Sequence, residues 1–387
     1  MRKADLPGWT ALAKLYPPPQ TTSPMTQSAY TPIFELTRGN TVETVHFGAL
    51  AVVDVHGRLV ASWGDPYAVT FLRSSAKPFQ VLPFLECGGA DYYHLSSVEI
   101  ALMCASHNGS DEHIAVLRSL QEKTGVRESD LRCGVHPISH IPTLEAMQQR
   151  GEALDQNRNN CSGKHTGMLA FARMRGLSLT DYLEFNHPIQ QDILRAFAEM
   201  CAMSVNQISL GIDGCSAPNF AIPLYNAALA FARLCDPDAG NVTPKARSRA
   251  CHQVVSAMIA HPVMVAGTDR FDTLLMQAAP GRLLCKSGAE GYLAMGLLPS
   301  ALYPASPAMG IALKISDGDL SGHSRPAGDS FGRARPAVAL EALRQLGALQ
   351  PSELKSLADF GPEFIVPNWR QIRVGLGRPC FELRHSV

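Results

Sequence analysis

Ser74 and Lys77 stand three residues apart in the stretch Arg73-Ser74-Ser75-Ala76-Lys77-Pro78, where we expect a helix to begin. Side chains three residues apart share one face of a helix, so this spacing places an amine beside a hydroxyl. A serine attacks well only after a base takes its proton, and a lysine is such a base only as the neutral amine. The site must therefore lower the ordinary lysine pKa of about 10.4, through burial or through a second cation.

The spacing alone is not decisive, because an ordinary helix start would also give it. Two further motifs follow in the chain, Ser106-His107-Asn108 and Lys286-Ser287-Gly288. Together the three reproduce the ordered S-x-x-K, S-x-N and K-[ST]-G set of serine β-lactamases and penicillin-binding proteins. The set predicts acyl transfer, in which Ser74 attacks a carbonyl carbon, Lys77 accepts its proton and backbone N–H groups hold the oxyanion. Lys286 would pair with Ser106 to move protons to the leaving group.

The elements that position these residues are early and late strands separated by helices. Residues 46–63 are apolar and β-branched, which predicts a β-hairpin with Gly57 at its turn. Residues 281–288 and 309–316 are further strand candidates, and the region at about 90–260 is mainly helical in pattern. A sheet built from the hairpin and the late strands around a helical middle predicts an α/β sandwich, with an antiparallel sheet flanked by helices.

Within the helical middle, we expect helices over 96–105, from an N-cap at Asp111 onward, and over 181–203. Two polar, glycine-containing loops, 159–167 and 211–218, each precede a predicted helix. Loops of this composition are where binding and catalytic residues concentrate. Both loops are therefore candidates for the functional site.

Composition and charge narrow the function classes. The chain has 387 residues, of which 46% are hydrophobic, enough for a large core. Lys and Arg together number 34, as do Asp and Glu, so no net field favours nucleic acid or an anionic membrane. The ten cysteines show no C-x-x-C pattern, which predicts reduced thiols. We expect a cytoplasmic protein with a disordered leader at 1–29 and a single catalytic domain at 30–387.

Four short blocks carry a family resemblance. Arg-Ser-Ser-Ala-Lys-Pro at 73–78, Ala-Ser-His-Asn-Gly at 105–109, Asn-Cys-Ser-Gly-Lys-His-Thr-Gly-Met at 160–168 and Gly-Ile-Asp-Gly-Cys at 211–215 together resemble the rhizobial-type (class 3) L-asparaginases. The resemblance covers about residue 30 to the C-terminus. It implies a serine β-lactamase-like fold, a homodimer, and hydrolysis of L-asparagine to L-aspartate and ammonia.

The resemblance also implies a set of site residues. It gives two catalytic Ser-Lys tandems and a zinc ion held by two cysteines, a lysine and water, with further residues that bind the substrate. The tandems are Ser74/Lys77 and Ser106/Lys286; the zinc ligands are Cys161, Lys164 and Cys215; the substrate-binding residues are Arg73, Asn108, His165 and Asp213.

Spacing alone would not have indicated that zinc site. Cys161 and Cys215 are 54 residues apart, and such cysteines are usually core thiols. A lysine ligand such as Lys164 must also lose its proton, which costs about 4 to 5 kcal/mol at pH 7. With three protein ligands and one open position, a zinc ion activates water or orients the charged end of the substrate. We favour orientation, because a serine already supplies the nucleophile.

Two alternatives remain open at this point. In the first, the same machinery acts on a β-lactam or an ester. In the second, the chain is a zinc-binding protein without catalysis, in which the cysteines and the lysine join two loops.

Overall fold

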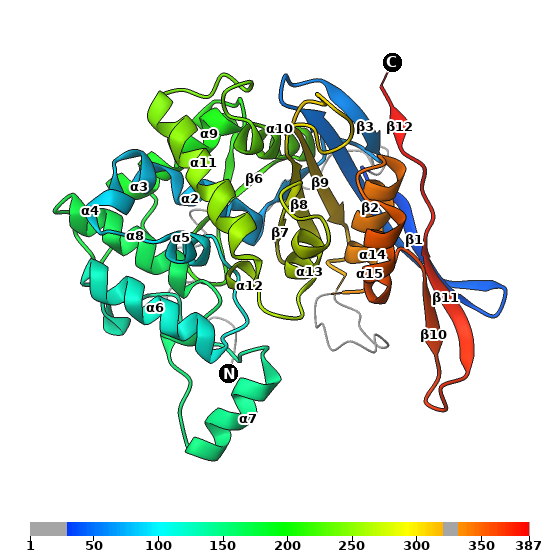
Figure 1. Cartoon of the computed structure of the whole chain (residues 1–387), viewed down its shortest axis with the longest axis horizontal. Coiled ribbons are helices and arrows are strands. Elements are labelled where there is room, and N and C mark those ends of the chain that lie inside the picture. Colours follow the sequence, from blue (N-terminus) through cyan, green and yellow to red (C-terminus); the bar gives the residue numbers. More distant parts are fainter. Residues whose placement is uncertain (1–28, 320–331, 387) are drawn as a thin grey trace, which may run out of the picture.

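The computed structural model describes residues 29–319 and 332–386 (Figure 1). An antiparallel sheet of nine strands lies within these residues, in the order β10-β11-β1-β2-β9-β8-β7, with β3 paired to β2 and β12 paired to β3. Its strands are β1 (Thr31–Arg38), β2 (Thr41–Asp54), β3 (Leu59–Trp63), β7 (Leu283–Ser287), β8 (Tyr292–Leu297), β9 (Met309–Ile315), β10 (Phe364–Pro367), β11 (Arg373–Pro379) and β12 (Arg384–His385).

A small second sheet connects two of the loops singled out in the sequence. It contains β4 (Val69–Phe71), β6 (Pro218–Pro223) and β5 (Ser209–Ile212), in the order β4-β6-β5. Strand β4 leads directly into η2 (Arg73–Ala76), and the turn that joins β5 to β6 carries Cys215. Because β4 pairs with β6, the turn with Ser74 and the turn with Cys215 belong to one rigid unit.

The helices occupy most of the chain between the early and late strands, to the left of the large sheet in Figure 1. The α-helices are α2 (Lys77–Gln80), α3 (Leu82–Glu86), α4 (Gly89–Tyr92), α5 (Ser97–Met103), α6 (Asp111–Thr124), α7 (Ile141–Arg150), α8 (Ser162–Met174), α9 (Pro188–Met200), α10 (Leu224–Cys235), α11 (Lys245–Ala260), α12 (Pro262–Val265), α13 (Phe271–Ala278), α14 (Ala334–Gln345) and α15 (Pro351–Ser356). Further 3₁₀ turns are η3 (Glu128–Asp130), η4 (Gln156–Arg158), η5 (Val205–Gln207) and η6 (Ala358–Phe360).

Helix α10 packs against β2, β8 and β9, and α14 packs against β1, β8, β9 and β11. The contact with α10 depends on Gly310 of β9. A Cβ atom there would lie 1.7 Å from the carbonyl oxygen of Ala228 in α10, so any larger residue would push the helix off the sheet. Sheet and helix thus share one continuous apolar core.

The predicted fold class is confirmed: an antiparallel sheet is flanked by helices, with a mainly helical middle. The hairpin is also confirmed, with Gly57 at a φ of 87° between β2 and β3. The predicted strands at 281–288 and 309–316 appear as β7 and β9. The sequence reasoning did not find β1 or β8, which complete the sheet beside them.

Several predicted helix boundaries were wrong. The helix expected over 181–203 begins only at Pro188, because the side chain of His187 caps the N–H of Ile189 and Pro188 fixes the first turn. The N-cap of α6 is Ser110, and Asp111 is its first helical residue. The loop at 211–218 leads into strand β6 instead of a helix. Most of the loop predicted at 159–167 belongs to helix α8.

The predicted leader, residues 1–29, lies outside the described residues except for residue 29. The single domain at 30–387 stays a prediction. Among the helices that the structure describes, none has the length and apolar character needed to cross a membrane.

Candidate active site

The hydroxyl of Ser106 lies between two buried lysines. Its Oγ atom is 2.9 Å from Nζ of Lys77 and 2.9 Å from Nζ of Lys286. Both lysine side chains are almost fully buried, at 1% and 0% exposed. Residues 77, 106 and 286 therefore meet at one point, although they come from helix α2, the loop after α5 and strand β7.

Lys77 has a hydrogen-bond acceptor for each proton of an ammonium group. Its Nζ atom lies 2.5 Å from the carbonyl oxygen of Ala105, 2.9 Å from Oγ of Ser106 and 3.2 Å from the carbonyl oxygen of Asn160. An ammonium group has three donors and no acceptor. The surroundings of Lys77 thus match its charged form.

Lys286 is placed differently. Its Nζ atom has two oxygen partners, Oγ of Ser106 at 2.9 Å and the carbonyl oxygen of Ser287 at 2.8 Å. Burial, the largest effect, lowers the pKa of Lys286 to about 7, with Asp272 opposing the shift and Lys77 adding to it. A neutral amine can donate to Ser287 and keep a lone pair for the proton of Ser106. Lys286 is therefore suited to act as a base near neutral pH.

Two local contacts fix η2 against β7. The hydroxyl of Ser75 donates to the carbonyl oxygen of Lys286 at 2.6 Å. Gly288, the last residue of the third motif, lies so close to η2 that a Cβ atom would be 2.4 Å from the carbonyl oxygen of Leu72. A glycine at 288 and a small hydroxyl at 75 are what allow the two segments to touch.

Ser74 lies at the same site but in a different setting from the one its spacing predicted. It lines a cavity of about 330 Å³ together with Ser106 and Ser287. Within the described residues its hydroxyl has no hydrogen-bond partner, and the amine of Lys77 instead contacts Ser106. The two residues are three apart, but η2 and α2 turn Lys77 toward the loop after α5.

Arg73, next to Ser74, connects this cavity to the turn between β5 and β6. Its Nε atom donates to Oδ1 of Asp213 at 2.7 Å, and its Nη1 atom lies 3.7 Å from Oε1 of Glu290. The backbone of Arg73 has a φ of 52°, in the left-handed region that residues other than glycine seldom occupy. Strain of this kind is tolerated where the surroundings fix the residue, and it concentrates at functional sites.

The cysteines and the lysine of the predicted zinc site converge. The Nζ atom of Lys164 lies 3.1 Å from Sγ of Cys215, and both side chains are buried. A hydrogen bond from Cys161, followed by the charge of Lys164, holds the pKa of Cys215 well below its usual range. Burial opposes the charged form of Lys164, but the two sulfurs raise its pKa. Cys215 thus lies between Cys161 and Lys164, and both neighbours favour its charged form.

This donor set fits a soft divalent cation. Two sulfur atoms and one amine are ligands that zinc accepts, once the ion replaces the protons of Cys161 and Lys164. Beside them, the Nδ1 atom of His165 lies 2.6 Å from the hydroxyl of Tyr182, and its buried Nε2 atom has no partner among the described residues. No three His, Cys, Asp or Glu side chains of the described chain form a metal site without the lysine.

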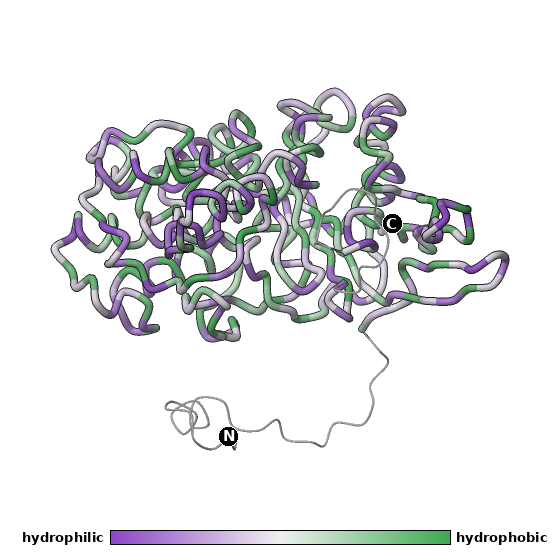
Figure 2. The backbone as a smooth tube through the Cα atoms, turned by 90° about the horizontal axis from the view of Figure 1, so that it is seen from below, coloured by the Kyte–Doolittle hydropathy of each residue, from purple (hydrophilic) through white to green (hydrophobic). Residues whose placement is uncertain are grey.

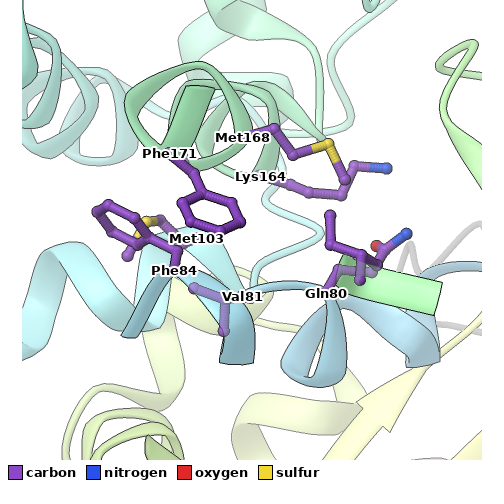
Figure 3. Close-up of a pocket in the computed structure, with 9 residues that line it drawn as sticks. Gln80, Val81, Phe84, Met103, Lys164, Met168 and Phe171 are labelled. Atoms are coloured by element: carbon purple, nitrogen blue, oxygen red, sulfur yellow. The ribbon is translucent and has the colours of Figure 1, made fainter. Parts of the chain in front are cut away.

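The side chain of Lys164 reaches this cluster across an apolar wall. Figure 3 shows its stem beside Met168, with the amine directed away from Phe84 and Phe171. Together these residues line a small cavity of about 10 Å³, and Lys164 is 4% exposed.

Residues 34–379 match the family described as L-asparaginase II. The chain belongs to this family. The predicted resemblance to L-asparaginases is thus confirmed, and this L-asparaginase II chain is an amidohydrolase.

Comparison with solved structures finds distant neighbours of this L-asparaginase II chain. A probable glutaminase from Bacillus subtilis, complexed with 6-diazo-5-oxo-L-norleucine, is 13% identical, with a TM-score of 0.38, and the match covers 78% of this chain and 84% of that chain. A mutant simvastatin synthase from Aspergillus terreus is 14% identical, with a TM-score of 0.33, covering 70% and 86%. No curated protein matches the sequence.

The structure of this L-asparaginase II chain brings Ser106 together with Lys77 and Lys286, and Lys164 together with Cys215, whereas the side chain of Asn108 has other contacts. The Oδ1 atom of Asn108 accepts the N–H of Ser110 at 3.3 Å, and its side chain packs against Gly267. This side chain does not line the cavity. The roles of the site residues stay predictions.

Sequence reasoning missed other residues at the site. His107 and His136 line the cavity, where His107 lies 2.9 Å from Oγ of Ser162 and His136 accepts the N–H of Asn160 at 3.0 Å. Arg270 lines it as well. His107 belongs to the S-x-N motif, and that position was a signal, whereas no motif marked His136 or Arg270.

We predict that Ser75→Ala weakens both the fold and the catalytic centre. The change leaves the carbonyl of Lys286 without its buried donor, which costs about 1 to 3 kcal/mol of unfolding free energy. It also loosens β7 against η2, so turnover of any amide substrate falls. Urea denaturation and steady-state kinetics measure the two effects.

The matched control is Ser356→Ala, which removes an exposed hydroxyl that donates to the carbonyl of Glu353 at 2.7 Å. It should change neither stability nor turnover appreciably. Equal effects of the two substitutions would contradict the role given to Ser75.

Proposed function

We propose that this chain hydrolyses L-asparagine to L-aspartate and ammonia by Ser-Lys nucleophilic catalysis. The observation that carries the proposal is the hydroxyl of Ser106 between Lys77 and Lys286, in the wall of a cavity that Ser74 also lines. Membership of the L-asparaginase II family supports the substrate.

In the proposed reaction Ser74 is the nucleophile and Ser106 relays protons. The Oγ atom of Ser74 attacks the side-chain amide carbon, and its proton passes through Ser106 to the neutral amine of Lys286. Lys77, as an ammonium, holds Ser106 in place and offsets the negative charge that develops on the amide oxygen. The tetrahedral intermediate then collapses, and the C–N bond breaks.

The proton returns along the same path. Lys286 donates it through Ser106 to the departing nitrogen, which leaves as ammonia. Water then hydrolyses the acyl ester on Ser74, with Lys286 again taking the proton. The lysine must be neutral at the start of each half-reaction, which agrees with its pKa near 7.

We also propose that Cys161, Lys164 and Cys215 hold a zinc ion. The ion would supply a fixed positive charge that orients the charged end of the substrate. On the protein side, Asp213 accepts from Arg73, and this ion pair links the metal turn to the residue next to Ser74. The pair would fix the distance between the bound amino acid and the nucleophile. His165, whose Nε2 atom has no partner among the described residues, would bind water or substrate beside the zinc ion.

A homodimer is the third part of the proposal. The hairpins β1–β2 and β10–β11 project from the body of the chain, and Figure 2 shows apolar residues along both. The strand registers put Val45 and Ile365 on one face. Val45 pairs with Glu35 and Glu35 pairs with Arg378, while Ile365 pairs with Leu376, two residues before Arg378. Phe47, two residues after Val45, is 44% exposed on the same face. The ion pair between Glu35 and Arg378 lies between Val45 and Ile365 on the same face. Exposed apolar side chains gathered around such a pair support an interface with a second copy.

The first prediction concerns the substrate and the nucleophile. Wild-type protein should release ammonia from L-asparagine, and Ser74→Ala should lower the rate at least about a thousandfold, because the proposed acyl ester forms on Ser74. A coupled ammonia assay measures this. The same preparations are assayed with nitrocefin and with p-nitrophenyl acetate. Faster turnover of either would favour a β-lactam or ester substrate, and full ammonia release by Ser74→Ala would remove the nucleophile.

The second prediction concerns zinc. Protein purified without chelators should contain about one zinc per chain, and Cys215→Ser should contain almost none, because a hydroxyl is a poor zinc ligand. Elemental analysis provides the readout. The control is Cys251→Ser, which alters a buried cysteine of α11 outside the cluster and should keep the metal. Zinc-free wild-type protein would contradict the proposal.

The third prediction concerns assembly. Wild-type protein should sediment as a dimer at micromolar concentration, and Phe47→Glu combined with Ile365→Glu should sediment as a monomer, because the carboxylates would have to be buried. Analytical ultracentrifugation measures this. Tyr92→Glu, at a 65% exposed aromatic on helix α4, is the control and should remain dimeric. A monomeric wild type would rule out the dimer.

A further inference from the structure

Asp272, in the first turn of α13, is a buried carboxylate that no motif marked. Its side chain is 3% exposed. Oδ2 accepts the backbone N–H of Ser287 at 2.7 Å, and Oδ1 accepts the hydroxyl of Ser287. Both oxygens are therefore committed to the residue that follows Lys286 on β7.

This contact fixes the direction of the hydroxyl of Ser287. A serine hydroxyl has one proton and two lone pairs. An ionised carboxylate can only accept, so the proton of Ser287 points at Asp272. Although burial opposes the charged form, Lys286 and the bonds from Ser287 keep the pKa of Asp272 below its usual value, so it is ionised at neutral pH. Ser287 lines the cavity and presents lone pairs to whatever binds there.

Among the charged groups, Asp272 also has the largest effect on the pKa of Lys286, which it raises. The groups that act on the lysine come from several elements: Asp272 from α13, Arg270 before it, Lys77 from α2, Cys104 after α5 and Cys285 from β7 itself, with Arg335 of α14 acting on Asp272. Burial raises the pKa of the Cys104 thiol to about 12 and that of Cys285 well above its usual range. Within the described part of the chain, Asp272 is thus the ionised acid among these groups.

We propose that Asp272 is a positioning residue of this centre, which holds Ser287 as a hydrogen-bond acceptor toward the substrate and sets the charge balance at Lys286. The proposal rests on the proposed amide hydrolysis and deepens it. An acceptor at this place binds an N–H group of an amino-acid amide. It would repel the carboxylate of an acidic ligand, because that group brings lone pairs against lone pairs.

The test is Asp272→Asn, which keeps the shape of the side chain and removes its charge. The new amide can still accept the N–H of Ser287, but its NH₂ group donates to Oγ and turns the proton of Ser287 into the cavity. Asparagine KM should rise at least about tenfold as the acceptor is lost.

The pH profile gives a readout that a merely structural role would not move. Asp272 raises the pKa of Lys286, so its removal lowers that pKa. A base works when neutral, above its pKa, so the acid limb of kcat/KM should move to lower pH by about one unit. An acid limb at the wild-type position would overturn the proposal.

Two further variants separate the parts of the argument. Ser287→Ala keeps the charge of Asp272, so it should raise KM while the acid limb stays in place; Ser287→Thr, which keeps a hydroxyl, should restore KM. These variants test the acceptor even if Asp272→Asn fails to fold. An unchanged KM in Ser287→Ala would overturn the acceptor role.

Asp54→Asn is the matched control. Asp54 is also 3% exposed and accepts two backbone N–H groups, from His56 and Arg58. It lies at the other end of the sheet register from Lys286, opposite Met309. The substitution Asp54→Asn should lower the free energy of unfolding and leave the pH profile of kcat/KM unchanged.

The outcome is distinguishable from failure of the proposed function. If the wild type releases no ammonia from asparagine, that function is wrong. The acid limb is then measured on the burst of p-nitrophenol from p-nitrophenyl acetate, which reports acylation of the serine. A shift of that limb in Asp272→Asn supports the positioning role, and no shift overturns it.

Discussion

Two lysines buried around one serine hydroxyl are the constraint on which the rest of the structure depends. Placing an unpaired ammonium in a protein interior costs several kcal/mol. The chain meets this cost in two ways: Lys77 is surrounded by three oxygens, and Lys286 has a pKa near 7. The neighbouring elements are shaped by the same need. Ser75 fixes the strand of Lys286, and Gly288 lets that strand approach η2.

The small sheet joins the serine centre to the cysteine cluster. Strands β4 and β6 pair, and the backbone N–H of Leu72 donates to the carbonyl of Phe220, so the turns at 73–76 and 213–217 move together. A second link runs through Asn160, whose carbonyl accepts from Lys77 and whose neighbour is Cys161. A change at the sulfurs would therefore reach the lysine through one peptide unit. The serine centre and the cysteine cluster are therefore joined through the backbone at two places.

The sequence was informative where chemistry is local and less so where it depends on packing. The three motifs predicted that Ser106 and Lys286 meet, and they do. The hairpin at Gly57 was also predictable, because a glycine between two apolar, β-branched segments supplies the positive φ that a tight turn needs. By contrast, spacing paired Lys77 with Ser74, whereas the turn from η2 into α2 aims it at Ser106.

The role of Asp272 could not be predicted from the sequence for a related reason. It is one acidic residue in an ordinary helix start, and its importance comes from the strand that happens to lie against it. Strand β8 was missed because its six residues are apolar without alternation, a pattern that does not distinguish a strand from a buried helix segment. The helix expected over 181–203 failed at its first turn, where a capping histidine and a proline outweigh the helical pattern.

The large sheet ends at β7 on one side, and on the other at β10 and, through β3, at β12. A free strand edge is a template for pairing with a foreign chain, and proteins blunt such edges. Helix α13 and η2 lie along β7, and the carboxylate of Asp272 occupies a backbone donor there. At the opposite border β10 is four residues long and closes on Pro367, which has no N–H to offer. The contacts that hold β7 beside η2 and α13 thus also limit the pairing of that edge with another chain.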